Sequence, residues 1–219
     1  MALRLVIGNK NYSSWSMRPW MAMKGTGMTF EETVIPLYEP ESKAAILRYS
    51  PAGKVPILVD GDRQVWESLA IIEYLAEKFP ERRLWPDDAG ARAHARAISA
   101  EMHAGFMPLR RHCPMNFRRQ PKARELTAEV KADVARIEAM WTDCRKRYGG
   151  PFLFGSFGAA DAMYAPVISR FHSYRVEVGA AARDYVNAVM ALPAWHEWSA
   201  AAHAEPWTVP SFEVDDDSR

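Results

Sequence analysis

The sequence has few cysteines and no long apolar segment, and these gaps exclude several classes of protein. Its 219 residues include two cysteines, Cys113 and Cys144, which lie far apart and form no CxxC pair. Neither a disulfide framework nor a paired-thiol redox site is indicated, and two incidental thiols are typical of a cytoplasmic protein. No apolar run approaches the roughly 20 residues that span a bilayer, and the N-terminus lacks the features of a signal peptide. We therefore expect a cytoplasmic protein that does not enter a membrane.

Patterns for binding metals, phosphates or nucleic acids are also missing. His94, His103 and His112 are nine residues apart, which turns each to the opposite face of a helix from the one before. The sequence contains no HExxH motif, no paired Cys and His at metal-binding spacing and no glycine-rich phosphate loop. The formal net charge is only +1, which gives no reason to expect a highly anionic partner. We expect neither a bound metal nor a nucleic-acid partner.

The most informative stretch covers residues 50–75. An apolar, β-branched run at 55–59 is typical of a short strand, and Asp60 with Gly61 is a strong hairpin-turn signal before a return strand at 64–66. Pro56 stands at the mouth of the first strand, where a missing N–H is tolerated and where cis-proline is found. The sequence leaves the state of that peptide bond open.

A helix is predicted directly after the hairpin, and its start has the chemistry of a ligand site. Ser68 is a good N-cap, and apolar residues recur at helical spacing over residues 72–79. The N–H groups and the positive dipole end of a helix suit a carboxylate, while the neighbouring Glu67 suits an ammonium group. This pair is fitted to hold the zwitterionic end of an amino acid. The alternative is an ordinary capped helix preceded by a solvated acid.

The whole stretch closely resembles the glutathione-binding half of the glutathione transferase superfamily. Its Val-Pro, Glu-Ser and Ile-x-Glu-Tyr-Leu signatures have the family's order and separations. The resemblance implies that glutathione is a substrate, that the backbone of Val55 before a cis Pro56 pairs with its cysteinyl part, and that an acid–serine pair holds its γ-glutamyl end. The glutathione site implied in this way comprises Ser14, Trp15, Lys54, Val55, Pro56, Glu67 and Ser68.

The order of predicted elements agrees with the same superfamily. Strands are predicted at 3–7 and 29–37, and with the hairpin and the helices between them they form a β-α-β-α-β-β-α, thioredoxin-like arrangement. Everything after the linker is predicted to be helical, at about 91–115, 122–148, 159–172, 180–191 and 194–203. The expected fold class is α/β plus all-α. Its parts are a thioredoxin-like glutathione-binding domain at 1–80, a linker at 81–90 and an all-helical C-terminal domain at 91–219.

The loop after the first strand holds the candidate catalytic residues. An N-cap at Ser16 makes Pro19 the third helical residue, where its missing N–H is harmless, so we favour a helix start there over one at Ser14. The Ser13-Ser-Trp-Ser-Met-Arg run most resembles the Ser-Ser-Cys-x-x-Arg motif of zeta-class transferases, the maleylacetoacetate isomerases. The resemblance implies that Ser13 is the catalytic serine and that Ser14 lies in the glutathione site.

A serine hydroxyl near a helix N-terminus can lower the pKa of the glutathione thiol, whose thiolate is the nucleophile. We therefore name Ser13 and Ser14 as the catalytic candidates, with Ser16 also in position and Tyr12 adjacent. Simple loop and helix-cap roles are the alternative for these serines. Trp15 stands where zeta enzymes have cysteine; it cannot act as a thiol and should narrow the pocket, so zeta-type isomerisation is not the expected activity.

A second-substrate pocket is expected between the domains, along the helix predicted at 91–115. Its candidate residues are Trp15, His103, Phe106, Met107, Arg110 and Arg111. Methionine and aromatic side chains make an adaptable surface, although packing in the core or in a dimer explains them equally well. An arginine that faces the cleft would favour an anionic substrate.

One departure from the family pattern lies at the start of the helix predicted at 159–172. The family normally has Ser or Thr three residues before Asp161, and this chain has Gly158. Glycine is an acceptable N-cap, and Asp161 still suits the first helical turn. We assign Asp161 a role in folding and none in catalysis.

We expect a homodimeric enzyme that adds glutathione to a small electrophile or isomerises one. A non-catalytic protein of the same fold, which binds glutathione or a partner protein, is the alternative. A glutathione-dependent thiol oxidoreductase is disfavoured, because no cysteine lies at the start of the first helix.

Overall fold

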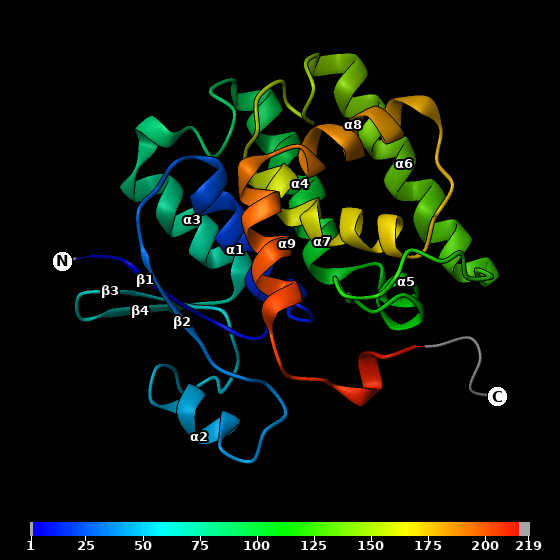
Figure 1. Cartoon of the computed structure of the whole chain (residues 1–219). Coiled ribbons are helices and arrows are strands. Elements are labelled where there is room, and N and C mark those ends of the chain that lie inside the picture. Colours follow the sequence, from blue (N-terminus) through cyan, green and yellow to red (C-terminus); the bar gives the residue numbers. More distant parts are fainter. Residues whose placement is uncertain (1, 215–219) are drawn as a thin grey trace.

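A computed structural model describes residues 2–214 of the chain. A small sheet with its helices packs against a larger group of helices (Figure 1). The elements of the first half are β1 (Arg4–Ile7), α1 (Ser14–Gly25), β2 (Glu31–Val34), α2 (Ser42–Leu47), β3 (Ile57–Asp60), β4 (Arg63–Trp66) and α3 (Ser68–Lys78). This is the predicted β-α-β-α-β-β-α order, so the thioredoxin-like arrangement is confirmed.

The strands lie in the order β2-β1-β3-β4. β1 runs parallel to β2, which requires the crossover through α1, and antiparallel to β3. β3 and β4 form the predicted hairpin, in which Asp60 pairs with Arg63 across the turn. The Asp-Gly signal therefore identified the hairpin, although Asp60 belongs to β3 and the two turn residues are Gly61 and Asp62.

Strand β1 is apolar along most of its length because both faces of the sheet are covered. Leu5 and Ile7 join the main core with α1 and α3, while Val6 packs with Ile46 of α2 and Ile57 in a smaller core. In Figure 1, α1 and α3 lie above the sheet and α2 lies below it. Alternate residues of a strand point to opposite faces, so a strand covered on both sides needs no polar alternation.

The second half of the described chain is helical, apart from isolated bridges within residues 152–156. Its α-helices are α4 (Ala89–Ala104), α5 (Met107–His112), α6 (Ala128–Tyr148), α7 (Ala159–Ser173), α8 (Ala180–Met190) and α9 (Pro193–Ala204). Short 3-10 turns lie at Pro80–Arg82 and Pro210–Phe212. Within residues 2–214, none of the helices combines the length and the apolar character needed to cross a membrane.

The single helix predicted over 91–115 is wrong. The chain breaks between α4 and α5, where Phe106 adopts a left-handed conformation with φ of 58°. Gly105 makes the break possible, because a Cβ built on it would lie 2.8 Å from the carbonyl oxygen of Glu101. The helix predicted from 122 also starts later, at Ala128, where Thr127 caps it by accepting a hydrogen bond from the N–H of Val130 at 3.4 Å.

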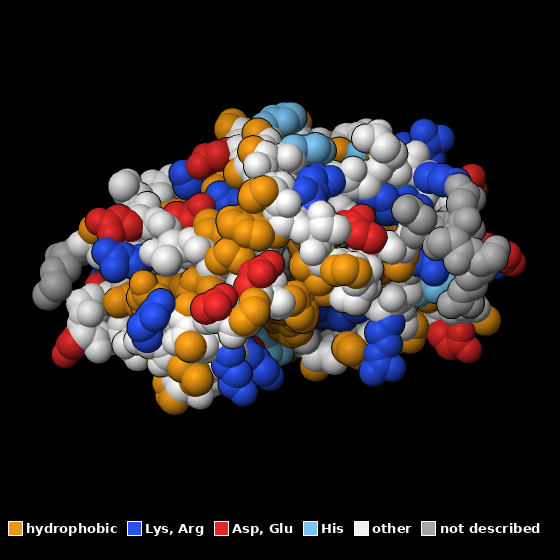
Figure 2. All heavy atoms as spheres, turned by 60° about the horizontal axis from the view of Figure 1, so that its bottom comes forward, with side chains coloured by type: hydrophobic (Ala, Val, Ile, Leu, Met, Phe, Trp, Pro, Cys, Tyr) orange, Lys and Arg blue, Asp and Glu red, His pale blue; other side chains and the backbone are white. Residues whose placement is uncertain are grey.

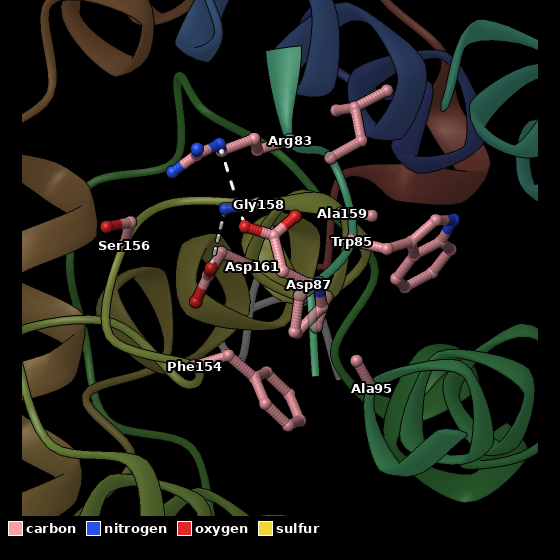
Figure 3. Close-up of a pocket in the computed structure, with 12 residues that line it drawn as sticks. Arg83, Trp85, Asp87, Ala95, Phe154, Ser156, Gly158, Ala159 and Asp161 are labelled. Carbon is pink, nitrogen blue, oxygen red and sulfur yellow. Dashed lines mark hydrogen bonds and ion pairs between the residues drawn. The ribbon is translucent and has the colours of Figure 1, made fainter. Parts of the chain in front are cut away.

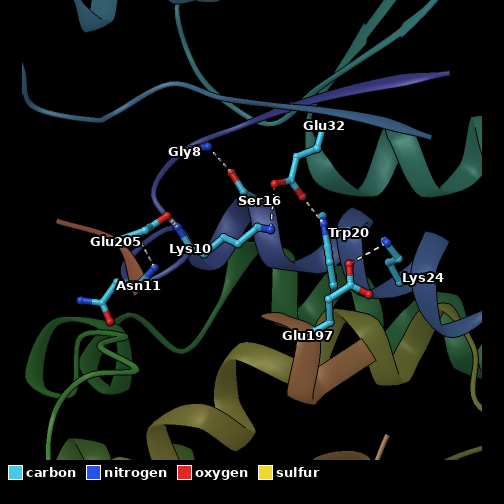
Figure 4. Close-up of polar contacts among 9 residues, drawn as sticks. All are labelled: Gly8, Lys10, Asn11, Ser16, Trp20, Lys24, Glu32, Glu197 and Glu205. Atoms are coloured by element: carbon cyan, nitrogen blue, oxygen red, sulfur yellow. Dashed lines mark hydrogen bonds and ion pairs between the residues drawn. The ribbon is translucent and has the colours of Figure 1, made fainter. Parts of the chain in front are cut away.

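The predicted starts of α1 and α3 are wrong by one to three residues. Ser13 is the N-cap of α1, and Pro19 lies inside the helix. The hydroxyl of Ser16 is occupied elsewhere, because it accepts a hydrogen bond from the N–H of Gly8 at 3.0 Å (Figure 4). In α3, Ser68 is the first helical residue, and Glu67 precedes it with a positive φ of 68°. Few non-glycine residues adopt this conformation, and those that do cluster at functional sites.

The start of α7 explains why this chain has glycine at 158. Asp161 accepts hydrogen bonds from the N–H of Gly158 at 2.9 Å and of Leu153 at 3.0 Å, as a folding residue should (Figure 3). The linker crosses this helix end, and the carbonyl oxygen of Leu84 accepts the N–H of Ala159 at 2.8 Å. A Cβ on Gly158 would lie 2.8 Å from that same oxygen. Only glycine leaves room for the linker.

A small cavity of about 210 Å³ lies where the linker meets α7. Arg83 and Asp87 of the linker face each other across its mouth with 3.7 Å between Nε and Oδ2, beside Gly158 and Asp161 (Figure 3). Asp161 is fully buried, and burial raises its pKa to about 6. Its two backbone donors account for its position, so this cavity is a structural junction between the two halves.

We predict that Gly158→Ser will destabilise the protein, although serine is ordinarily the better N-cap. Overpacking against the Leu84 carbonyl should cost about 1–3 kcal/mol in free energy of unfolding, measured by urea denaturation. Ser156→Ala is the control, because Ser156 is exposed and lies only two residues before Gly158. A Gly158→Ser variant as stable as the wild type would contradict this explanation.

Candidate active site

A pocket of about 790 Å³ opens between the start of α1, the α2 region and the loop before β3. Residues that line it include Ser13, Trp15, Leu37, Tyr38, Lys43, Lys54, Val55, Pro56, Trp66, Glu67 and His103. The face of the molecule that carries α2 and the C-terminal segment shows hydrophobic side chains gathered across its middle, with Lys and Arg side chains towards its edges (Figure 2). The pocket therefore combines an apolar surface with a few charged groups, as ligand sites commonly do.

Ser13 presents a hydroxyl to this pocket from the positive end of α1. Its Oγ accepts a long hydrogen bond from the N–H of Ser16 at 3.4 Å, and the two hydroxyl oxygens lie 2.8 Å apart. The Oγ of Ser16 already accepts the N–H of Gly8, so its own proton can be donated to Ser13 (Figure 4). In that arrangement the proton of Ser13 is left for an acceptor in the pocket.

Glu67 and His103 form the opposite, charged side of the pocket. The Nε2 of His103 lies 3.7 Å from Oε2 of Glu67, whose side chain is half exposed. Burial lowers the pKa of His103, with Arg18 acting in the same direction and Glu67 opposing them. The imidazole is therefore neutral at neutral pH, so it does not compete with a cationic ligand group for Glu67.

The indole of Trp15 packs against the guanidinium groups of two arginines, Arg18 and Arg110, on the side away from the pocket. The guanidinium carbon of Arg18 lies 4.1 Å from the centre of the Trp15 ring, and that of Arg110 lies 5.1 Å from it. Arg18 is fully buried; its Nη1 donates weakly to the Oγ of Ser68 at 3.5 Å, and its Nε and Nη2 have no partner among the described residues. Burial lowers the pKa of Arg18, and Arg110 lowers it further. The indole supplies the compensating cation–π contact.

Neither cysteine belongs to this pocket. Cys113 and Cys144 are buried and unoxidised, and burial raises the pKa of Cys144 to about 12, which makes it an inert thiol. No group of three or more His, Cys, Asp or Glu side chains within the described part of the chain is arranged to hold a metal ion. The chemistry available to the pocket is therefore that of hydroxyls, the carboxylates of Glu39 and Glu67, one neutral imidazole and the nearby cations.

Comparisons with known proteins agree with this site. The model for the glutathione S-transferase N-terminal domain matches residues 12–78, and the model for the C-terminal domain matches 120–201. Glutathione S-transferase 1 of Dianthus caryophyllus is 31% identical over 159 residues, which cover 71% of this chain and 72% of that protein. The chain belongs to the glutathione S-transferase family.

Zeta-class proteins recur among its relatives, which confirms the predicted similarity to that class. A probable maleylacetoacetate isomerase of Caenorhabditis elegans is 42% identical over 96 residues, which span 44% of each chain. A solved zeta-class maleyl pyruvate isomerase covers 94% of this chain and all of its own, with a TM-score of 0.71 and 23% identity. A Burkholderia glutathione transferase homolog with bound glutathione has a TM-score of 0.70 at 23% identity and covers 92% of this chain and 98% of its own. At this identity, both structures show the fold alone.

The transferase fold brings together most of the glutathione-site residues expected from the sequence. Trp15, Lys54, Val55, Pro56 and Glu67 line the pocket, and the peptide bond before Pro56 is cis. The other two expected residues do not line it. Ser14 is buried in the first turn of α1, and the Ser68 side chain is fully buried next to Arg18.

Most of the expected second-substrate residues lie away from the pocket. Trp15 and His103 line it, whereas Phe106, Met107, Arg110 and Arg111 do not. The break at Gly105 is the physical cause, because it starts a new helix at Met107 and leaves that side chain exposed. Arg110 instead donates to the carbonyl oxygens of Gly105, at 2.9 Å, and Met102, behind Trp15.

The sequence did not predict that residues around α2 form one wall of the pocket. Leu37, Tyr38 and Lys43 come from the segment around α2, which reads locally as a loop with a weak helix. Their place depends on Ile46 packing into the small core beneath the sheet. Tyr12, which is adjacent to the serines in sequence, is bonded to the C-terminal segment and does not line the pocket.

Proposed function

We propose that this protein is a glutathione transferase that binds glutathione in the pocket between α1 and α2 and activates its thiol for conjugation to a small electrophile. Family membership supports the activity, and one observation supports the site: Ser13, Val55 and Glu67 face the same pocket. These residues come from three separate segments of the chain. Each offers the group that one part of glutathione requires.

The proposed binding mode follows the charges of the ligand. The Glu67 carboxylate takes the ammonium of the γ-glutamyl group, and the first N–H groups of α3, at Ser68, take its carboxylate. The backbone of Val55 pairs with the cysteinyl part. Lys54 supplies a positive charge on the pocket wall for the terminal carboxylate. The buried Ser68 hydroxyl acts indirectly, through its contact with Arg18.

The proposed chemistry needs the glutathione sulfur beside Ser13. The Ser13 hydroxyl donates to the sulfur, and the positive end of α1 favours its negative charge. The thiol releases its proton to solvent, and the thiolate then forms a bond to the electrophilic carbon while the leaving group departs with the electron pair of its own bond. In this assignment Ser13 is the catalytic serine, and Ser14 serves the start of α1.

Isomerisation is the second candidate function, because maleylacetoacetate isomerases are among the relatives. We place conjugation first, since Trp15 occupies the cysteine position and is more than one-third exposed on the pocket wall, where it narrows the space beside the sulfur. The wild type should therefore turn over a maleyl substrate more slowly than a general aromatic electrophile. Trp15→Cys should raise the ratio of the maleyl rate to the conjugation rate.

We predict that Glu67→Ala will weaken glutathione binding by about 1.5–3 kcal/mol, the scale of a hydrogen bond to a charged group. Isothermal calorimetry measures this directly. Glu77→Ala is the matched control, because Glu77 is exposed on the same helix and does not line the pocket. Equal binding by the Glu67→Ala variant, or none by the wild type, would remove this site.

We predict that Ser13→Ala will raise the pKa of bound glutathione and slow conjugation at neutral pH. Removing one preorganised donor to a developing anion costs up to about 2.7–4 kcal/mol, and a serine–thiolate bond should fall below that range. Thiolate absorbance as a function of pH is the measurement, with Ser14→Ala as the control. If the pKa of bound glutathione changes in Ser14→Ala and not in Ser13→Ala, the catalytic role belongs to Ser14 instead.

We also propose a cytoplasmic homodimer. Two buried free thiols suit a reducing compartment. Trp66 and Met107 are large apolar side chains that remain exposed on the single chain, and burial against a second copy would cover them. Light scattering at micromolar concentration should give twice the chain mass of 24.8 kDa. A mass near 24.8 kDa would contradict the dimer.

A further inference from the structure

The loop that leads into Ser13 is held from the far end of the chain. The side chain of Glu205, just after α9, reaches residues 10 and 11 (Figure 4). Its Oε1 accepts the N–H of Lys10 at 2.6 Å, and its Oε2 accepts the N–H of Asn11 at 3.0 Å. One carboxylate therefore satisfies two consecutive backbone donors in the turn before the candidate catalytic serine.

This turn sets the position of Ser13. The carbonyl oxygen of Asn9 accepts the N–H of Tyr12 at 3.2 Å and that of Ser13 at 2.8 Å. Lys10 and Asn11 lie inside that turn, so the carboxylate that fixes their N–H groups also fixes the direction in which the chain enters α1. Ser13 follows directly as the N-cap.

Further contacts fasten the same turn to residues 205–213, which we call the C-terminal strap. Arg118 donates to the carbonyl oxygens of Glu205, at 2.7 Å, and Trp207, at 2.5 Å, and also to the Tyr12 hydroxyl, at 2.8 Å. The Tyr12 hydroxyl donates to Glu213. Tyr12, which is adjacent to the candidate serines in sequence, thus holds the strap.

The strap also contacts the pocket wall formed by the α2 region. The ring of Phe212 lies 5.5 Å from that of Tyr12 and 6.0 Å from that of Tyr38, between ring centres. Tyr38 lines the pocket. The strap therefore reaches both the turn that carries the serine and the side of the site formed by the α2 region.

The charge of Glu205 does not serve the stability of the fold at neutral pH. Burial raises the pKa of this carboxyl above its ordinary value, against the opposing effect of its hydrogen bonds from Asn11 and Lys10. An acid whose pKa is raised by folding contributes most to stability below its unfolded pKa, and that contribution is lost as the pH rises through the folded value. Glutamate at this position is better explained by the two N–H groups that it holds.

We propose that Glu205 is a positioning residue that orients the Ser13 hydroxyl towards the glutathione sulfur. The proposal rests on the function proposed above. Its basis is geometric: the two carboxylate oxygens hold the turn in which the Asn9 carbonyl accepts the N–H groups of Tyr12 and Ser13, directly before α1. Glu205 touches no substrate in this role and acts only through Ser13.

Glu205→Gln tests this role, because an amide has one acceptor oxygen and must turn its NH₂ towards the other backbone donor. In this variant we expect the pKa of bound glutathione to rise by about 0.5–1 unit, which lowers the thiolate fraction about threefold to tenfold at a pH below the wild-type pKa, where the assays are run. The value of kcat should fall by the same factor, with KM within about twofold. Affinity for S-methylglutathione, which has no thiol, should not change.

Glu197→Gln is the matched control. Glu197 lies on α9, the helix that Glu205 follows; it is exposed and pairs with Lys24 at 2.7 Å, away from the turn (Figure 4). Both variants should melt within about 3 °C of the wild type, the shift that roughly 1 kcal/mol produces in a chain of this size. Should Glu205→Gln melt lower, Glu205→Asp replaces it, since its charge is kept but its shorter side chain cannot reach both donors.

The double variant Ser13→Ala/Glu205→Gln completes the test. If Glu205 acts through Ser13, it should show the same thiolate pKa as Ser13→Ala alone. A thiolate pKa in Glu205→Gln equal to that in Glu197→Gln, or an additive effect in the double variant, would overturn the positioning role. A wild-type protein that binds glutathione without forming a thiolate would instead overturn the proposed function, and this role with it.

Discussion

The site depends above all on the burial of helix α1 between the sheet and the helical half. Met17, Trp20 and Met21 are fully buried, and α1 packs along both α3 and α7. A helix held on every side cannot shift or rotate without opening the core. Its first residue therefore has a fixed place, and the Ser13 hydroxyl and the positive helix end are presented to the pocket together.

The same burial removes the Arg18 guanidinium from water, and the Trp15 ring offsets part of the resulting loss of solvation. Arg18 enters the core on α1 with two donor nitrogens unpaired among the described residues, and Arg110 lies nearby. A buried, unpaired cation is expensive, and the face of an aromatic ring is one of the few apolar groups that offsets it. Trp15 meets this need and at the same time forms the pocket wall. Replacing it would change both the electrostatics of α1 and the shape of the site.

Two sets of contacts join the two halves of the chain, one at the start of α7 and one at the turn before α1. The linker lies against the start of α7 through the Leu84 carbonyl, which explains Gly158. The C-terminal strap lies against the turn before α1 through Glu205 and Arg118. The thioredoxin-like half thus carries the proposed glutathione-binding groups, while the helical half holds the turn that precedes the proposed catalytic Ser13.

Signals between neighbours in the chain determined much of this protein. The Asp60-Gly61 signal identified the hairpin, and Asp161 set the start of α7. The Val-Pro and Glu-Ser signatures identified the family and three residues of the pocket, Val55, Pro56 and Glu67. The tertiary structure alone decided that α1 begins after Ser13, that α2 forms a pocket wall and that Glu205 reaches the catalytic turn. Turn and cap signals are local, because the groups that satisfy each other lie within a few residues. Glu205 and Lys10 are 195 residues apart, and only the folded core brings them together.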